Sequence, residues 1–424
     1  MSCMLIDSAK LDVMNFLNEI SSKYPDAISF ASGRPTESSF NTKAWIENID
    51  LFVKYGAEKS SISKDEYLMQ IAQYGKTTGI INELILKQVE IDEAIKADEK
   101  NIIVTSGCQE ALFLCLKTLC KEKDDVLIMM DPTYTGVIGL SIINNITVKS
   151  TPNISEERFI EKLEMSIYEV IKTKMKPRAI YLIPNFDNPM GVSLSFKDRI
   201  QLIELCKLYD IKIIEDNPYG MFSFDEHQFP PLYELDRYGS VYYLGTYSKT
   251  ICPSMRVGFI LLPKTVHGVK NTIDLKNEIS TIKSYITLNT SQIMQAAVGG
   301  TLIREKYTLK NMIRKARDRY RENRDAIEDE LTNYFSSIEG ISWNHANGGF
   351  FITVKFPCEF TVDDVKACAK NNGVIFMPLS FFSTSKKYDK MIRLSFSNLS
   401  TDAIHMGVQG LASYIKQKLN YRYY

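Results

Sequence analysis

The sequence predicts an α/β fold in which a mainly parallel sheet is flanked by helices and is followed by a smaller α+β domain. Three observations carry this prediction. Apolar, β-prone runs alternate with segments of helical periodicity, as in folds built from strand–helix–strand units. Several of these runs end in polar side chains. A long charged helical stretch then separates them from a second group of short strands.

The N-terminal part is expected to begin with a helix over residues 9–24, because apolar residues recur there at helical spacing and the stretch ends at Pro25. A short strand follows and breaks at Gly33 and Pro35. This places Arg34 in a turn, where backbone amides can approach a ligand. An ordinary turn with an exposed arginine explains the same residues.

The body of the chain carries the strands of the predicted sheet. Each is a short run of β-branched, aliphatic or aromatic residues, bounded by turn-forming residues. The strands begin at Ile102, Val126, Tyr181, Ile211 and Val241, and helices are expected at 80–87, directly after the turn at Gly107, and at 196–209. Continuous apolar runs of this kind are typical of strands that are buried on both faces of a parallel sheet.

A second, smaller α+β domain is expected after a helical connector. Residues 291–335 show a long, charged, proline-free helical pattern. Short strands return at 349–355 and 391–396, with a helix at 362–371 between them and a terminal helix near 401–419.

Composition favours small-molecule chemistry. Lys and Arg total 51 and Asp and Glu also total 51, so bulk charge favours neither nucleic acid nor an anionic membrane as a partner. No apolar run approaches the ~20 residues of a spanning helix, and Met1–Asp7 lacks the pattern of a leader, so the expected compartment is the cytoplasm. The 8 cysteines form no CxxC pair and the 4 histidines show no ligand spacing, so neither a zinc site nor a disulfide framework is indicated.

Lys249 lies between two apolar runs, just after the strand that begins at Val241 has passed into Gly, Thr and Ser. Ligands bind at the carboxyl ends of strands in open α/β sheets, so this position suits chemistry. Burial and the nearby Arg256 both disfavour a charged amine, and a neutral lysine attacks aldehydes. The chemistry indicated is a Schiff base. Taken alone, a lysine that reaches solvent beside an ordinary ion pair explains the same residues.

Polar side chains at the ends of neighbouring strands support the first interpretation. Because the carboxyl ends of parallel strands meet at one edge of a sheet, we expect these side chains to converge. The residues concerned are Asn188, then Asp216 with Tyr219, and then Ser248 with Lys249.

The turn from Ser106 to Gln109 is a candidate anion site. The first amides of the helix that begins there point outward, and the helix dipole favours negative charge, so a phosphate can be held at Gly107. Any α/β turn has this shape. Tyr134, which follows another strand, could stack on a flat ring or simply pack on its neighbours.

Taken together, these motifs resemble those of the fold-type-I enzymes that use pyridoxal 5'-phosphate (PLP), specifically the class I/II aminotransferases of the aminoadipate and kynurenine type. The resemblance runs from about Met14 to Phe396. The motifs that carry it are Thr246-Tyr-Ser-Lys-Thr250 with Arg256, Asn188-Pro189, Asp216-Asn-Pro-Tyr219, and Arg393.

The resemblance implies a large domain with a mainly parallel seven-stranded sheet and a small α+β domain. We expect residues 46–310 to form the large PLP-binding domain, residues 311–424 to form the small one, and residues 1–45 to join the small domain. A homodimer with shared active sites is also implied, in which Tyr74 reaches the phosphate held by the other subunit. The implied substrates are an L-amino acid and a 2-oxo acid.

The resemblance also implies roles for the motif residues. Lys249 would form the Schiff base with PLP and then move the proton between the α-carbon of the amino acid and the cofactor. Asp216 would pair with the protonated ring nitrogen. Tyr219 and Asn188 would hydrogen-bond the phenolic oxygen of the ring, and Tyr134 would stack on the ring.

The remaining implied contacts concern the phosphate and the substrate. Arg393 would grip the α-carboxylate of the substrate with two parallel hydrogen bonds, a geometry that lysine cannot supply. The substrate side chain is expected near Gly33 and Arg34, with Asn188 also in contact. Arg34 would contact an acidic or hydroxylated side chain, or pair with a pocket residue. The implied phosphate ligands are Gly107, Cys108, Gln109, Thr246, Ser248 and Arg256.

Several positions depart from the family pattern. Cys108 stands where a serine commonly contacts the phosphate, Asp187 and Met190 replace a glutamine and a threonine, and Ser254 replaces a glycine. None of these changes removes a catalytic group. The opening, from Val13 to Pro35, is also similar to aminotransferases of secondary metabolism that make arylglycines such as dihydroxyphenylglycine.

Transamination is the predicted reaction, and two alternatives stay open. The same residues serve PLP-dependent lyases, decarboxylating enzymes and oxygen-using enzymes, because the pocket decides the fate of a shared intermediate. A non-catalytic effector domain of a transcriptional regulator would carry a DNA-binding domain ahead of this one, which a match that starts near Met14 disfavours. The amino donor and the acceptor are left open.

Overall fold

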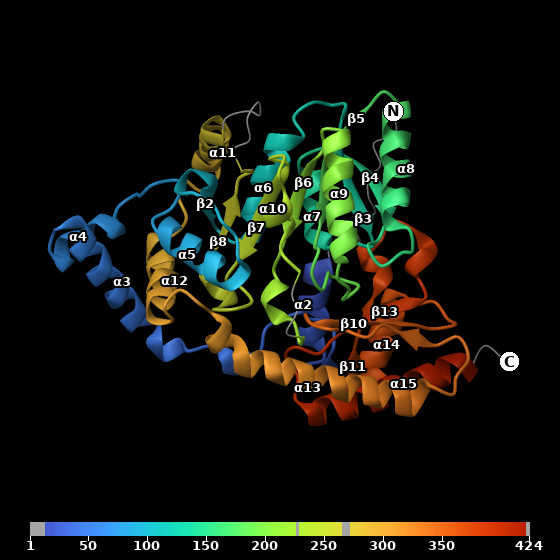
Figure 1. Cartoon of the computed structure of the whole chain (residues 1–424). Coiled ribbons are helices and arrows are strands. Elements are labelled where there is room, and N and C mark those ends of the chain that lie inside the picture. The colour runs from blue at the N-terminus through green and yellow to red at the C-terminus, as the bar shows by residue number, and fades with distance from the viewer. Residues whose placement is uncertain (1–12, 226–228, 265–271, 421–424) are drawn as a thin grey trace.

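The computed structural model describes residues 13–225, 229–264 and 272–420, and its larger part is built on a seven-stranded sheet (Figure 1). The strand order is β2–β8–β7–β6–β5–β3–β4. All neighbouring strands are parallel except β8, which is antiparallel to β2 and β7. The predicted mainly parallel sheet is therefore confirmed. The strands are β2 (Ile102–Thr105), β3 (Asp125–Asp131), β4 (Thr147–Pro152), β5 (Lys176–Leu182), β6 (Lys212–Asp216), β7 (Val241–Thr246) and β8 (Gly258–Leu261).

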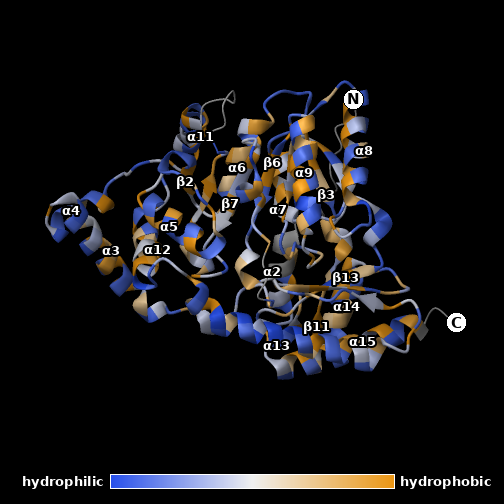
Figure 2. Ribbon diagram, in the orientation of Figure 1, coloured by the Kyte–Doolittle hydropathy of each residue, from blue (hydrophilic) through white to orange (hydrophobic). Residues whose placement is uncertain are grey.

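Helices cover both faces of this sheet, and successive strand residues alternate between two hydrophobic clusters. On β2, Ile103 belongs to one cluster, and Ile102 and Val104 belong to the other. Figure 2 shows the apolar residues gathered on the strands and on the inner sides of the helices. The first cluster takes in α6 (Cys108–Leu119), α7 (Thr135–Ile143) and α11 (Thr272–Ile286); the second takes in α5 (Asn82–Glu93), α8 (Phe159–Lys172), α9 (Phe196–Leu208), α10 (Leu232–Leu235) and α12 (Gln292–Arg304).

Two strands and several helix boundaries differ from the sequence prediction. The sequence prediction contains neither β8 nor β4. Strand β8 occupies the apolar run after Arg256, and β4 is an edge strand whose partly exposed residues give no continuous apolar run. The helix expected at 80–87 begins later and runs further, as α5. The helix expected at 9–24 is α2 (Val13–Lys23), and residues 9–12 lie outside the described part of the chain.

The helical stretch predicted over 291–335 consists of two helices. Helix α12 packs in the large sheet assembly against α3 (Trp45–Ser60), and α13 (Lys310–Phe335) runs on to the C-terminal part. Between them Lys306 and Tyr307 have φ angles of 54° and 62°. Left-handed residues cannot continue a right-handed helix, so the chain changes direction there.

The C-terminal part holds a second sheet, antiparallel, in the order β12–β13–β10–β9. Its strands are β9 (Ser342–Trp343), β10 (Phe351–Lys355), β12 (Met377–Pro378) and β13 (Met391–Ser395), and α14 (Val362–Asn372) and α15 (Thr401–Asn420) accompany it.

The N-terminal segment is tied to this C-terminal part. Strand β1 (Ile28–Ser29) pairs in parallel with β11 (Val374–Ile375). Helix α4 (Lys64–Ala72) lies at the far end of the large part, beside α3 (Figure 1). Within the described ranges, no helix combines the length and the apolar character that crossing a bilayer requires.

Candidate active site

A cavity of about 300 Å³ opens at the carboxyl ends of β5, β6 and β7, where the N-terminal segment and the C-terminal sheet meet the large sheet. Gly107 lies in the turn beside it. Tyr74 lies outside it, 83% exposed, in the segment after α4. The cavity brings together most of the site residues proposed from the sequence: Gly33, Arg34, Cys108, Gln109, Tyr134, Asn188, Asp216, Tyr219, Thr246, Ser248, Lys249, Arg256 and Arg393.

Lys249 follows the end of β7 and reaches across the cavity to the N-terminal segment. Its Nζ atom donates a hydrogen bond to the carbonyl of Gly33 at 3.0 Å. Burial is the main cause that lowers the pKa of Lys249 to about 8, and the positive charges of Arg393 and Arg256 add to it. The residue itself is only partly buried, because the cavity reaches it. Arg393, from the distant β13, acts on Lys249 more than the neighbouring Arg256 that the sequence singled out.

Asp216 ends β6 and accepts hydrogen bonds on both carboxylate oxygens. The Tyr181 hydroxyl donates to Oδ2 at 2.7 Å, and the Cys108 thiol donates to Oδ1 at 3.2 Å. Burial raises the pKa of Asp216 above its ordinary value. The Cys108 side chain therefore points at this carboxylate, and the phosphate contact predicted for Cys108 is left to its backbone amide. Tyr181 was missed because it reads as one more residue of a buried strand.

The turn before α6 is shaped by Arg256. Gly107 has a φ angle of 77°, and a Cβ atom built there would lie 2.3 Å from an Arg256 guanidinium nitrogen. Glycine suits this position, because the positive φ angle strains any other residue and a Cβ atom would displace the Arg256 guanidinium. Arg256 also donates to the Ser248 hydroxyl at 3.2 Å. Helix amides, a guanidinium and a hydroxyl thus meet at one place, which suits an anion.

Arg393 lies on β13 with its guanidinium between two aromatic rings. The guanidinium carbon is 4.3 Å from the centre of the Phe351 ring and 4.6 Å from that of Phe382. Arg393 donates to Asn188 Oδ1 at 2.6 Å and to the carbonyl of Ala31. Its Nε atom is buried and has no hydrogen-bond partner among the described residues. Arg393 lines the cavity, and a buried guanidinium there is suited to receive a carboxylate.

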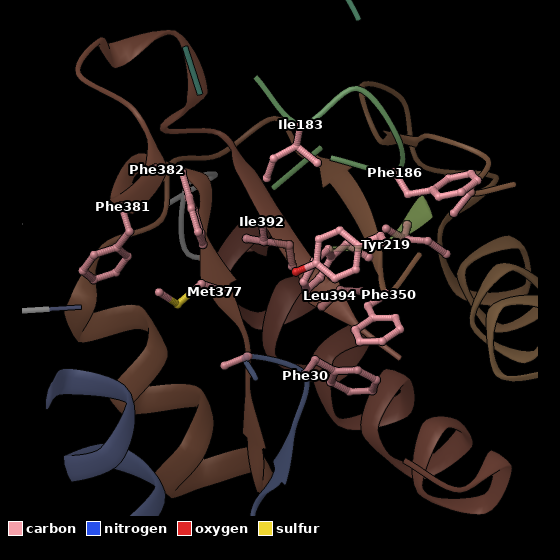
Figure 3. Close-up of a cluster of buried hydrophobic side chains, with 14 of the residues drawn as sticks. Phe30, Ile183, Phe186, Tyr219, Phe350, Met377, Phe381, Phe382, Ile392 and Leu394 are labelled. Atoms are coloured by element: carbon pink, nitrogen blue, oxygen red, sulfur yellow. The ribbon is translucent and has the colours of Figure 1, made fainter. Parts of the chain in front are cut away.

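Aromatic residues pack against the Tyr219 ring. Its ring lies 5.1 Å from that of Phe350 and 5.6 Å from that of Phe351, both edge-on. Figure 3 shows Tyr219 beside Phe350, with Met377 and Phe382 on the other side of the group. Phe351 was missed as a cavity residue, because an apolar residue at the start of a strand reads as ordinary core.

The N-terminal turn contributes Gly33 and Arg34. A Cβ atom at Gly33 would lie 2.5 Å from the Phe351 ring, so the absence of a side chain lets the turn pack closely on this ring. Arg34 is exposed along the cavity wall, and its carbonyl accepts a hydrogen bond from the Ser397 hydroxyl at 2.5 Å. The exposed Arg34 side chain lines the cavity, where it can face a ligand that enters.

A lysine of lowered pKa, a buried carboxylate and an anion-binding turn at the carboxyl edge of this sheet define a PLP-dependent enzyme of fold type I. The chain belongs to the aminotransferase class I and II family, whose model matches residues 64–411. It is therefore a PLP-dependent aminotransferase that transaminates amino acids. Across the described residues, no group of three or more His, Cys, Asp and Glu side chains is placed to hold a metal ion.

Similar proteins support this assignment. The chain is 34% identical to (S)-3,5-dihydroxyphenylglycine transaminase of Amycolatopsis orientalis, over 96% of this chain and 92% of that one. It is 27% identical to the mitochondrial kynurenine/alpha-aminoadipate aminotransferase of Bos taurus, over 97% of each. The crystal structure of the multiple substrate aminotransferase from Thermococcus profundus superposes with a TM-score of 0.82 at 26% identity, covering 99% of this chain and 98% of that one.

The residues of the cavity fit PLP. Only a neutral amine attacks an aldehyde, and the lowered pKa of Lys249 makes this form more abundant near physiological pH than it is for an ordinary lysine. A pyridine nitrogen stays protonated beside a carboxylate, and Asp216 is the carboxylate that lines the cavity. A phosphate requires an electropositive turn, and the segment from Ser106 to Gln109 with Arg256 supplies that.

We expect the rate at which the cofactor-free protein reacts with pyridoxal to rise with pH around a midpoint near 8, the pKa of Lys249. Only the neutral amine attacks an aldehyde, and Lys249 loses its proton above this pKa. Stopped-flow absorbance across the pH range measures the midpoint. Arg393→Met removes one of the positive charges and should move the midpoint upward. A midpoint at the ordinary lysine value in both proteins would contradict this account.

Proposed function

We propose that Lys249 has two roles in transamination by this protein: it binds the cofactor covalently, and it transfers the proton. The observation that carries the proposal is that Lys249, Asp216 and Arg393 line one cavity, with the pKa of Lys249 lowered to about 8. PLP supplies an aldehyde and a cationic ring that stabilises negative charge at the amino acid's α-carbon. Lys249 binds the aldehyde and then, as a free amine, carries the proton to and from that carbon.

The other cavity residues hold and orient the cofactor in this proposal. Asp216 supplies the counter-charge of the ring nitrogen, Tyr134 covers the ring face, and Asn188 and Tyr219 donate to the phenolic oxygen. The phosphate binds the amides of the turn at Gly107, Cys108 and Gln109, with Thr246, Ser248 and Arg256. The hydrogen bond between Arg256 and Ser248 supports this role, because it joins two of the donors before a ligand arrives.

Arg393 is proposed to bind the α-carboxylate of both substrates. Arg393→Lys should raise KM for the amino donor by about 10- to 100-fold and lower kcat less, because an ammonium group cannot form the two parallel hydrogen bonds. Steady-state kinetics with varied donor and saturating acceptor measure the change. The exposed Arg321→Lys serves as a control that should leave KM as it is. An unchanged KM in Arg393→Lys would contradict the assignment.

An aromatic, hydroxylated amino acid is the proposed donor class, with arylglycines first. The apolar part of the cavity wall is supplied by Phe351, Phe382 and Met377. The polar part comes from Arg34 and from serines of the N-terminal region, namely Ser21, Ser29 and Ser32. An aromatic ring with hydroxyl groups matches such a mixed wall. The transaminase of Amycolatopsis orientalis, named for (S)-3,5-dihydroxyphenylglycine, supports the same class.

A spectral titration tests this function. The protein with bound PLP is mixed with single amino acids, without acceptor, and the visible absorbance is followed with and without oxygen. Conversion to the pyridoxamine form by dihydroxyphenylglycine or phenylglycine, faster than by aminoadipate, kynurenine or alanine, supports the donor class. Conversion by aminoadipate alone contradicts the arylglycine class and leaves transamination in place. Release of a side-chain fragment, or decay only with oxygen, contradicts transamination itself.

A homodimer with shared sites is proposed from the surface around Tyr74. Met69 is 68% exposed and Ile293 is 49% exposed. The Gln292 side chain donates to the carbonyl of Ile71, so α4 and the start of α12 lie together. Exposed apolar side chains on adjoining elements suit a protein interface.

Sedimentation tests the dimer, and mixed subunits test the sharing. Neither Lys249→Ala nor Tyr74→Ala should be fully active alone. Refolded together, they should regain activity, because the mixed dimer holds one site with both residues intact. A monomer, or a mixture no more active than its parts, would contradict the shared site.

A further inference from the structure

Lys283 and Glu110 form a buried ion pair directly behind the turn that precedes α6. Lys283 Nζ lies 2.8 Å from Glu110 Oε2, and the two side chains are 0% and 6% exposed. Lys283 also donates to the hydroxyls of Thr287 and Thr290, at 2.9 and 3.2 Å. Thr287 in turn donates to the other Glu110 oxygen at 2.5 Å. The carboxylate and the ammonium are thus fully bonded inside the protein.

The pair acts on the turn through Glu110. Glu110 is the third residue of α6, and its Oε2 atom accepts the backbone N–H of Ser106 at 2.6 Å. This bond fixes the turn just before Gly107. It also places a negative charge within the first turn of the helix, where it opposes the binding of any external anion. Arg256 lies on the side of the turn that faces the ligand. Lys283 lies on the buried side, where it neutralises the Glu110 carboxylate.

Stability alone does not account for such a pair. Removing two charges from water costs free energy that their attraction often only balances, and an apolar pair of the same size can be as stable. The Glu110 carboxylate accepts the Ser106 N–H, but its charge would repel an anion bound at the turn. A buried cation that neutralises Glu110 keeps this hydrogen bond and removes the repulsion. Lys283 is that cation.

We propose that Lys283 is a positioning residue for the cofactor phosphate: it neutralises Glu110 and so keeps the turn from Ser106 to Gln109 both fixed and electropositive. The inference rests on the proposed function, which assigns the phosphate to this turn. No contact of Lys283 with the cofactor is involved.

Equilibrium binding of PLP and of pyridoxal to the cofactor-free protein tests the inference. Pyridoxal lacks the phosphate, so it reports on everything in the site except the phosphate contact. Lys283→Met should weaken PLP by about tenfold or more, through the uncompensated carboxylate, and leave pyridoxal within about twofold. The double variant Lys283→Met with Glu110→Gln should restore PLP affinity, because the pair is again neutral and the glutamine still accepts from Ser106.

Controls separate the outcomes. Lys264→Met breaks another 2.8 Å ion pair, with Glu234, far from the turn and should change neither affinity. Equal losses for PLP and pyridoxal, or a double variant no better than the single one, would overturn the proposal and indicate a purely structural pair. If Lys283→Met does not fold, Lys283→Gln takes its place, because glutamine removes the charge and can still donate to Glu110. A loss of affinity for PLP alone supports the proposal, and equal losses for PLP and pyridoxal overturn it.

The proposed function can fail separately. Arg256→Ala removes a phosphate ligand and should weaken PLP selectively. If it does not, the phosphate lies elsewhere and the assignment of the turn is wrong. If Arg256→Ala weakens PLP while Lys283→Met does not, the turn holds the phosphate and only the role of Lys283 is refuted.

Discussion

Replacement of Lys249 by alanine should lower kcat by about 10⁴-fold or more, because one change removes both the nucleophile and the group that carries the proton. An assay of 2-oxo acid formed from the donor measures this loss. PLP should still bind to the variant through the turn at Gly107 and Arg256, but without a covalent link. The visible spectrum of the variant with PLP should therefore be that of the free aldehyde, and borohydride should no longer fix the cofactor to the protein.

A lysine on the same sheet provides the control. Lys212 begins β6, at the edge opposite the cavity, and pairs with Asp210 at 3.2 Å. Lys212→Ala should leave kcat and the spectrum unchanged. If Lys249→Ala kept more than about a hundredth of the activity, the proton would have another carrier and the central role of Lys249 would be wrong.

The sheet and the place of the site could be predicted because the signals are local. Continuous apolar runs marked most of the strands, and polar residues at their ends marked the edge where ligands bind. Strand β4 could not be predicted in this way, because an edge strand is apolar on only part of its surface and so lacks a continuous apolar run. The break between α12 and α13 could not be predicted, because neither Lys306 nor Tyr307 is a residue type that marks a helix end. Their left-handed conformation is what separates the two helices.

The contacts that tune the site could not be predicted, because they join residues far apart in sequence. Arg393 lies more than a hundred residues from Lys249 and still lowers its pKa. Tyr181 and Cys108 meet at Asp216 from two different elements. The motif predicts a phosphate contact for Cys108 but does not show that its thiol points to the Asp216 carboxylate. Side-chain direction of this kind depends on the packed structure.

The burial of Asp216 gives it opposite effects on stability and on catalysis. Burial raises its pKa, so the folded protein binds this proton more tightly than the unfolded chain does. The free energy of unfolding of the cofactor-free protein therefore falls as pH rises through the window between the two pKa values. At neutral pH the ionised carboxylate costs stability, and a cationic ring nitrogen beside it offsets that cost.

Asp216→Asn should accordingly leave the Tm of the cofactor-free protein unchanged or raise it, while kcat falls by about 10²- to 10⁴-fold. The asparagine can still accept the Tyr181 hydroxyl, but it cannot keep the ring nitrogen protonated. The gain in Tm on adding PLP should also be smaller than in the wild type. Thermal denaturation with and without PLP, beside steady-state kinetics, measures all three quantities.

Glu215 is the matched control for this variant, because it precedes Asp216 on β6 and points to the other side of the sheet. Its carboxylate accepts the backbone N–H groups of Leu232 and Tyr233 at 2.9 and 2.8 Å, away from the cavity. Glu215→Gln should change stability and leave kcat nearly as it is. If both variants lost stability and activity in parallel, Asp216 would act as a structural carboxylate. A loss of activity confined to Asp216→Asn, with no loss of Tm, would instead show that its charge serves the cofactor.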